Sequence, residues 1–158
     1  MTPSPVRNGR GATSRMRGRI GGGVIEVRFE RPASGVNAAW VKRLVRRTLR
    51  SERSKKSGVG VLFTGDAGIR RLNKKFLRHD YATDVISFGL GEEKSLGDLV
   101  VSVETARRVS RELGIGFREE LARYVVHGTL HLLGYEDKKK KDRKKMFTRQ
   151  EAILKKFL

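Results

Sequence analysis

Apolar residues along this chain recur in two patterns. Short stretches rich in β-branched and aromatic residues, bounded by glycine or polar residues, are typical of strands. They cover residues 23–29, 59–64, 84–88 and 99–103. Longer stretches repeat apolar residues at helical spacing, as amphipathic helices do. They cover residues 40–49, 66–77, 104–113, 117–133 and 146–157. Strands interleaved with helices predict a single α/β domain over residues 23–158, with a mixed sheet of about four strands packed against about five helices.

The first 22 residues do not follow these patterns. They contain five arginines, several serines and glycines, and no acidic residue. Such a composition cannot bury a core, so residues 1–22 are expected to form a disordered basic arm. An organelle transit peptide has a similar composition, and an overlong gene start would also explain it. We favour the basic arm.

Charge adds a second signal. The 158 residues include 36 lysines and arginines against 17 acidic residues, a net charge of +19. A surplus of this size attracts polyanions such as nucleic acid or an anionic membrane face, although a solubility surface or basic tails would also produce it. No apolar run is long enough to span a bilayer. The chain has no cysteine, which excludes disulfides and thiolate metal sites and suits a reducing compartment.

The candidate chemistry lies at the end of the predicted helix 117–133. His127 and His131 are four residues apart, so a helix places both imidazoles on one face, where they can hold one metal ion. Gly134 can end that helix and let the chain turn back, so that Asp137 offers an oxygen to the same ion. Two imidazoles and one further protein ligand, with a position left for water, is how catalytic zinc is usually held.

Other interpretations of these residues remain open. The histidines can be ordinary hydrogen-bonded residues, and Glu136 and Asp137 can be a solvated acidic pair that balances the lysines after them. Three details favour a metal site: Gly128 removes bulk beside His127, Gly134 permits a turn, and the acidic pair follows at once. The zinc protease motif needs a glutamate where this chain has Gly128, which argues against that class of protease.

The block His127-Gly128-x-Leu130-His131-Leu132-x-Gly134-Tyr135 resembles the signature of the YbeY family of metal-dependent endoribonucleases, which mature ribosomal RNA. Three further blocks match the family in order and spacing: Leu72-Asn73-x-x-Phe76, Asp80-x-x-Thr83-Asp84-Val85-Ile86-Ser87-Phe88 and Gly97-Asp98-Leu99-Val100. The resemblance implies a single-strand-specific, zinc-dependent endoribonuclease of the cytoplasm. It also implies a role in small-subunit ribosomal RNA 3′ end maturation and ribosome quality control. The implied partners are the ribosomal RNA precursor and the small ribosomal subunit with its proteins.

The chain departs from the family pattern at the metal site. The family has a third histidine at position 137, where this chain has Asp137, and an aspartate at position 136, where it has Glu136. The implied ligands of Zn²⁺ are therefore His127, His131 and Asp137, with a metal-bound water as the attacking group. A carboxylate in place of an imidazole lowers the charge of the site by one. We expect a slower enzyme, or one that prefers another divalent metal such as manganese.

A second departure concerns a catalytic arginine. The family has an arginine where this chain has Leu77, and Arg78 follows one residue later; the usual proline before Thr83 is Ala82. Arg78 is the candidate to stabilise charge on the phosphate. Leu77 and Asp137 also favour an alternative function, a ribosome-associated RNA-binding factor with weak or lost nuclease activity. A metal-dependent hydrolase of another ester or amide is a further alternative, which the net charge disfavours.

Substrate contacts are expected from six residues: Arg43, Arg47, His79, Thr83, Ser87 and Lys138. The basic side chains among them can bind phosphates without reading sequence, and His79 can do the same or simply be exposed. Thr83 and Ser87 can line the cleft or orient the histidines, or they can serve only as strand caps and turns.

Overall fold

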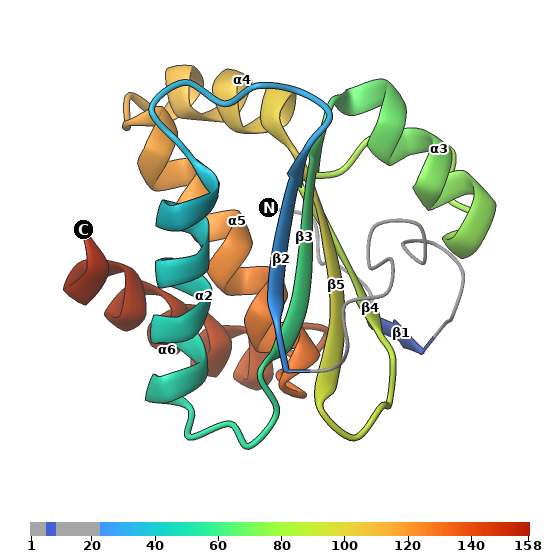
Figure 1. Cartoon of the computed structure of the whole chain (residues 1–158). Helices are drawn as coiled ribbons and strands as arrows, with labels where there is room; N and C mark the ends of the chain where they lie inside the picture. Colours follow the sequence, from blue (N-terminus) through green and yellow to red (C-terminus); the bar gives the residue numbers. More distant parts are fainter. Residues whose placement is uncertain (1–5, 9–22) are drawn as a thin grey trace.

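A mixed sheet forms the centre of the fold (Figure 1). The structure of the chain is a computed structural model that describes residues 6–8 and 23–158. The strands are β1 (Val6–Asn8), β2 (Ile25–Phe29), β3 (Gly58–Thr64), β4 (Val85–Gly89) and β5 (Ser95–Ser102). They lie in the order β1-β4-β5-β3-β2, and β4 is antiparallel to β5 whereas the other neighbours are parallel.

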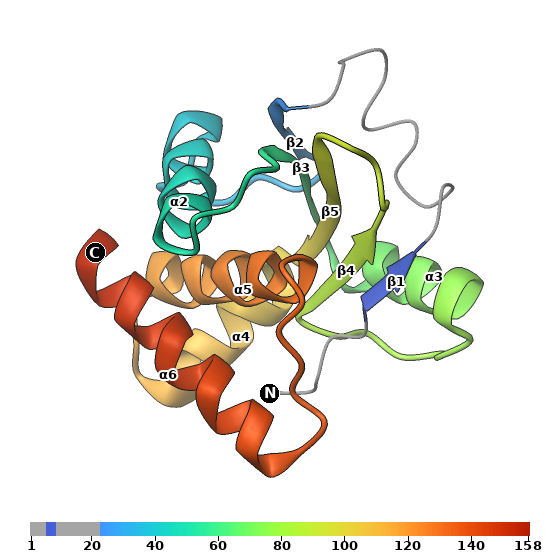
Figure 2. The same ribbon diagram turned by 90° about the horizontal axis from the view of Figure 1, so that it is seen from below.

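Helices cover both faces of this sheet (Figures 1 and 2). They are α2 (Ala38–Ser51), α3 (Asp66–Leu77), α4 (Val103–Leu113), α5 (Phe117–Leu132) and α6 (Lys140–Phe157). Seen from below, α2 and α5 lie on one side of the strands with α6 outside α5, and α3 lies on the other side (Figure 2). None of the helices in the described part of the chain combines the length and apolar character needed to cross a lipid bilayer.

The alternation of side chains along the strands divides the core in two. Leu99 and Val101 of β5 point to the face covered by α2, α5 and α6 and join its large apolar cluster. Val100 points to the opposite face, where it packs with Ile69 of α3 and with Phe88 of β4. Helix α5 is buried along most of its length between the sheet and α6, so the side chains near its end are shielded from water.

The predicted fold class is confirmed: the structure is α/β, with a mixed sheet, five helices in the described residues and the candidate metal group at the end of a helix. Strand β5 begins at Ser95, earlier than the predicted 99, because it continues as a hairpin with β4 as far as the Gly89–Gly97 pair. Strand β1 lies within the expected basic arm and pairs with residues 87–89 of β4. Residues 1–5 and 9–22 lie outside the described residues, so the disordered arm stays a prediction.

Helix α5 packs closely against the sheet at Gly128. A Cβ atom placed there would lie 2.8 Å from Cδ2 of Leu99 and 3.0 Å from Cγ2 of Val85, which is closer than side-chain atoms pack. The hydroxyl of Ser87 donates a hydrogen bond to the carbonyl oxygen of Gly128 at 3.0 Å. Gly128 therefore lets the helix seat on β4 and β5, and the space that it frees faces the sheet rather than the metal ligands.

Candidate metal centre

Three side chains meet at the C-terminal end of α5. His127 and His131 lie one helical turn apart, and both are buried together with Asp137 from the segment after the helix. Nε2 of His127 lies 3.1 Å from Nε2 of His131. Oδ2 of Asp137 lies 3.2 Å from Nε2 of His131 and 3.4 Å from Nε2 of His127. The three predicted ligands are thus brought together with one donor atom each facing a common point.

The spacing of these atoms fits a metal ion. Ligands about 2.0 Å from a tetrahedral ion are separated from one another by about 3.3 Å, which follows from the tetrahedral angle. The three separations here, from 3.1 to 3.4 Å, lie close to that value. Two imidazole nitrogens and one carboxylate oxygen are also a donor set that zinc and harder divalent ions accept. The group can therefore hold one divalent cation.

A hydrogen bond at Nδ1 of His131, the ring nitrogen that faces away from Asp137, determines which of its two nitrogens carries the proton. Nδ1 of His131 lies 2.9 Å from the carbonyl oxygen of Tyr135, and a carbonyl can only accept, so Nδ1 carries the proton. In the neutral ring Nε2 then has a lone pair, and it faces the carboxylate of Asp137. Two acceptors at this distance need a positive charge between them, either a proton or a metal ion. This arrangement is the one in which histidine binds metals in proteins.

Burial and neighbouring charges favour the protonation states in which His131 and Asp137 can bind a metal ion. Burial lowers the pKa of His131, the nearby His127 lowers it further, and Asp137 opposes both without reversing the fall, which favours the neutral ring. Burial raises the pKa of Asp137, but its contacts with the two histidines outweigh this effect and leave that pKa below its usual value. A neutral imidazole and an ionised carboxylate are the forms that coordinate metals.

The turn after α5 brings Asp137 back to the histidines. Gly134 adopts φ +102°, a conformation that favours glycine, and it ends the helix as predicted. Of the acidic pair, Asp137 points inward and is buried, whereas Glu136 is exposed. The hydroxyl of Tyr135 donates to Glu52 at the end of α2 at 3.0 Å. Arg149 of α6 donates to the same carboxylate, so α2 and α6 together anchor the turn.

The sequence alone gives no signal for the residues that support the site. Glu52 and Arg149 are distant in the chain from the histidines, and only the packing of α2 and α6 against the turn brings them there. The same holds for Gln150, whose side-chain oxygen lies 2.8 Å from Nδ1 of His127.

Two of the expected substrate residues are buried. Thr83 is 6% exposed, and its hydroxyl donates to Asp84 at 3.3 Å. Ser87 is fully buried, and its hydroxyl donates to the carbonyl oxygen of Gly128 in the helix that carries the histidines; its contact with substrate stays a prediction.

Four other predicted residues are exposed around the fold. Arg43 and Arg47 lie on the outer face of α2, and Lys138 directly follows Asp137. Arg78 follows the end of α3 in the left-handed conformation, with φ 58°. Among the described residues, no hydrogen bond or ion pair joins Arg78 to the three ligands. Its role at the phosphate stays a prediction.

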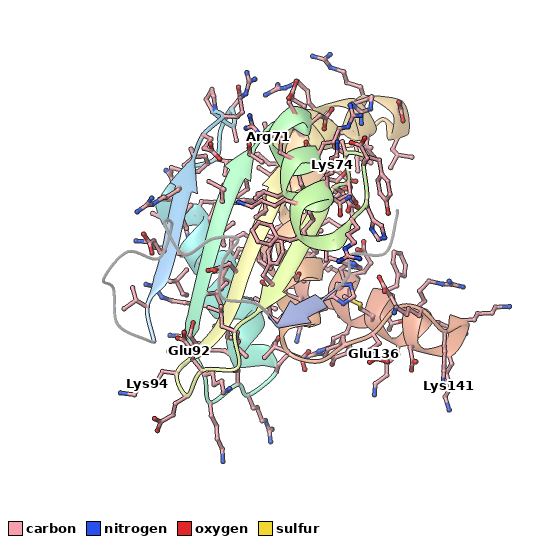
Figure 3. The ribbon with its side chains drawn as sticks, turned by 90° about the vertical axis from the view of Figure 1, so that its right-hand side faces the viewer. Arg71, Lys74, Glu92, Lys94, Glu136 and Lys141 are labelled. Carbon is pink, nitrogen blue, oxygen red and sulfur yellow. The ribbon has the colours of Figure 1, made fainter. Side chains whose placement is uncertain are left out.

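His79 is also exposed and forms part of an aromatic pair that the sequence analysis missed. Its ring stacks on Tyr81 with the centroids 5.3 Å apart, and the phenol oxygen lies 3.2 Å from Nδ1 of His79. Arg71 and Lys74 of the preceding helix α3 are exposed, and so is Lys141 of α6, which lies apart from them (Figure 3).

A cavity of about 650 Å³ opens between residues 82–84 and helices α4, α5 and α6. Apolar side chains such as Ile115 and Phe147 form part of its wall, and Asp84 and Glu151 supply carboxylates. Burial raises the pKa of Asp84, although a hydrogen bond from the amide of Val85 opposes the rise. The volume lies within the range of roughly 300–1,000 Å³ typical of small-ligand pockets. Glu151 lines this cavity and its neighbour Gln150 contacts His127, but the lining does not include any of the three candidate ligands.

Fold and site together define a class of protein: an α/β protein with a buried His-His-Asp group that can hold one metal ion. The family model described as "Endoribonuclease YbeY" matches residues 29–158. The chain belongs to the YbeY family, as the sequence resemblance predicts. It is therefore a member of a family of nucleases, hydrolases that act on RNA.

Individual relatives agree with this assignment. The Endoribonuclease YbeY of Aquifex aeolicus is 46% identical over 97 residues, which cover 59% of this chain and 65% of the relative. That of Desulforamulus reducens is 41% identical over 125 residues, covering 72% and 82%. The solution structure of TM1509 from Thermotoga maritima has a TM-score of 0.61 and 28% identity, and the match covers 85% of this chain and 89% of that one. The chain thus spans just under two thirds of the Aquifex relative.

Proposed function

We propose that this chain is a single-strand-specific, zinc-dependent endoribonuclease that acts in ribosomal RNA processing, at the 3′ end of the small-subunit RNA, and in ribosome quality control. The observation that carries the proposal is the convergence of three donor atoms, from His127, His131 and Asp137, within 3.4 Å of one another. This group lies in a member of a family whose curated relatives are named endoribonucleases.

In this proposal the metal ion and the residues of the chain have separate roles in RNA cleavage. A divalent cation supplies Lewis acidity, polarising a phosphoryl oxygen and lowering the pKa of a nearby water. The two histidines and Asp137 hold the ion, and the turn anchored on Glu52 keeps Asp137 against the histidines. Arg78 is the proposed partner of the negative charge that builds on the phosphate. Its exposed position at the end of α3 leaves its guanidinium free to reach a bound strand.

Several surface features support RNA as the substrate. Exposed basic residues lie on α3, such as Arg71 and Lys74, and after the metal site, such as Lys138 and Lys141. Such residues bind phosphates without reading sequence, which suits a single strand. The exposed His79–Tyr81 pair offers a flat ring surface on which an unpaired base can stack. The cavity between residues 82–84 and helices α4, α5 and α6, of about 650 Å³, has room for a base. Arg43 and Arg47 add positive charge on α2.

A second candidate function is a ribosome-associated RNA-binding factor with weak or lost nuclease activity. Asp137 favours it, because a carboxylate ligand leaves the cation a weaker Lewis acid than a third imidazole would. Leu77 favours it as well, because the catalytic arginine is displaced to Arg78. The Asp137→His variant separates the two candidates: a gain in cleavage rate or zinc affinity is expected if the carboxylate limits the site. No gain in either would contradict that explanation.

Metal analysis combined with an RNA cleavage assay tests the main proposal. The wild type is expected to carry about one zinc per chain and to cleave a single-stranded RNA. The His127→Ala variant is expected to lose both. His79→Ala is the matched control for metal content, because His79 is the only histidine outside the site. Lys94→Ala, in the exposed turn between β4 and β5, is the control for cleavage. Undiminished cleavage by His127→Ala would overturn the proposal.

The partners and location are proposed on the same basis. Ribosomal RNA precursor and the small ribosomal subunit with its proteins are the partners that the family role requires. The absence of cysteine suits a reducing compartment, and we place the protein in the cytoplasm. Copurification of small-subunit RNA at moderate salt is the expected result, and recovery of no ribosomal RNA would contradict it.

A further inference from the structure

Gln150 of α6 contacts His127 on the side of the ring that faces away from the other metal ligands. It is fully buried, and it is the only glutamine in the chain. Its side-chain oxygen lies 2.8 Å from Nδ1 of His127, the ring nitrogen that faces away from the other ligands. The contact joins α6 to the end of α5, where both histidines are placed.

Neighbouring charges fix the orientation of the Gln150 amide. Its Nε2 donates to Oε2 of Glu151 at 3.0 Å. Arg123 of α5 holds that carboxylate with two hydrogen bonds, from Nε at 3.0 Å and from a terminal guanidinium nitrogen at 2.9 Å. A rotated amide would place its oxygen against the carboxylate of Glu151, which repels it. The amide oxygen is therefore held toward His127.

This orientation decides which nitrogen of His127 carries the proton. An amide oxygen only accepts, so Nδ1 of His127 donates to it, and Nε2 of the neutral ring keeps its lone pair. His131 is set in the same way by the carbonyl of Tyr135. Both rings then direct lone pairs toward the carboxylate of Asp137. Three acceptors at 3.1–3.4 Å repel one another until a cation lies between them.

We propose that Gln150 is a positioning residue of the metal centre, which selects the metal-binding tautomer of His127 and holds its ring, with Glu151 and Arg123 fixing the amide. The inference deepens the proposed function and rests on its metal site, but not on its RNA substrate. The amide is neutral, so it orients His127 without adding charge to a ligand set that already includes Asp137.

Nitrogen NMR of the histidine rings in the full-length, metal-free protein tests the tautomer directly at mildly alkaline pH. In the wild type, Nδ1 of His127 is expected to be protonated. In Gln150→Met, which keeps the side-chain volume and removes the acceptor, a mixture of tautomers is expected. In Gln150→Glu, which restores an acceptor and removes the donor to Glu151, Nδ1 stays protonated. A wild-type His127 with unprotonated Nδ1 overturns the proposal.

Zinc affinity, measured by competition with a chelator, is the second readout. Gln150→Met is expected to bind zinc about 10- to 100-fold more weakly, the usual effect of losing the hydrogen-bond partner of a ligating histidine. Met146→Ala is the packing control, because Met146 is buried on the same helix one turn earlier. It should lose stability and keep its zinc affinity.

The two readouts separate this inference from the proposed function. Equal zinc affinity in the wild type and Gln150→Met, or equal losses in Gln150→Met and Met146→Ala, overturns the positioning role. A wild type that binds no zinc overturns the metal site itself, and the tautomer measurement still decides whether Gln150 sets the state of His127.

Discussion

The hydroxyl of Ser87 and the carbonyl of Gly128 join the sheet to the helix that carries the metal ligands. The bond measures 3.0 Å and is fully buried. It lies beside a close contact of α5 with β4 and β5, where the side chains of Leu99 and Val85 pack against the backbone of Gly128. His127 is the next residue toward the start of the helix, so the position of its ring depends on this contact.

The first prediction concerns that close contact. Gly128→Ala places a methyl group 2.8 Å from Leu99 and 3.0 Å from Val85, so α5 must shift away from the sheet. Overpacking of this kind typically costs about 1–3 kcal/mol of unfolding free energy. We also expect weaker zinc binding, because the shift moves His127. Urea denaturation and chelator competition measure the two effects. Gly116→Ala is the control, since its Cβ would have no atom closer than 4.0 Å; equal behaviour of the two variants would refute the prediction.

Adjacent acidic residues provide a matched test of the third ligand. Asp137→Ala removes the oxygen 3.2 Å from His131, whereas Glu136→Ala removes an exposed carboxylate of the same charge. Removing a hydrogen-bond partner of a metal ligand typically weakens metal binding by about 10- to 100-fold. Removing a ligand itself should weaken it more, so zinc affinity is expected to fall by more than about 100-fold in Asp137→Ala. Isothermal titration measures it. Comparable affinities in the two variants would show that Asp137 is not a ligand.

The salt dependence of RNA binding tests the basic segment after the metal site. Lys138 is exposed and directly follows Asp137. If it contacts one phosphate, Lys138→Ala weakens binding to single-stranded RNA and reduces the slope of log affinity against log salt by about 0.7. Fluorescence anisotropy at several salt concentrations gives the slope. Lys94→Ala, at the exposed turn before β5, should leave the slope unchanged, and a change of the same size there would point to a non-specific charge effect.

The pH dependence of stability is predicted from Asp66, which joins α3 to α4. Its carboxylate accepts hydrogen bonds from Ser102 and Thr105, both at 2.6 Å, and from Arg108 at 3.1 Å. Burial raises the pKa of Asp66, but these contacts outweigh it and lower that pKa below 3.8. The stabilisation is therefore complete above pH 3.8 and is lost as the pH falls through the lower folded-state value.

Asp66→Asn makes this contribution measurable. At pH 7 the variant should lose about 1.5–3 kcal/mol of unfolding free energy, the range for hydrogen bonds to a charged group. The difference from the wild type should shrink as the pH is lowered below 3.8. Urea denaturation across the pH range tests both points, with Glu93→Gln in the exposed β4–β5 turn as the control. A difference that stays constant down to low pH would show that the charge of Asp66 is not the cause.

Local spacing made much of the metal centre predictable. His127, His131 and Gly134 act within one helix and its end, where four-residue spacing and a glycine conformation determine the geometry. Asp137 was predictable because the turn is short. The choice between it and Glu136 agrees with the structure, in which only Asp137 points inward.

Contacts between distant segments could not be predicted in this way. Gln150, Glu52 and Arg149 reach the site only after α2 and α6 pack against α5, and nothing in their immediate neighbours marks them. Gly128 was correctly singled out, but for a different reason: its missing side chain accommodates the sheet and not the metal ligands. The early start of β5 was missed because Ser95 and Gly97 do not resemble a strand in isolation.

The anchoring of the turn on Glu52 has a consequence for how the site can form. The residues that hold the three ligands in place extend from Glu52 to Glu151, and no shorter continuous piece of the chain contains them all. A peptide spanning only the two histidines and the aspartate would lack the residues of α2 and α6 that orient these side chains. Tight binding of a cation therefore requires that α6 has packed against α5, so metal binding indicates that the chain has completed folding.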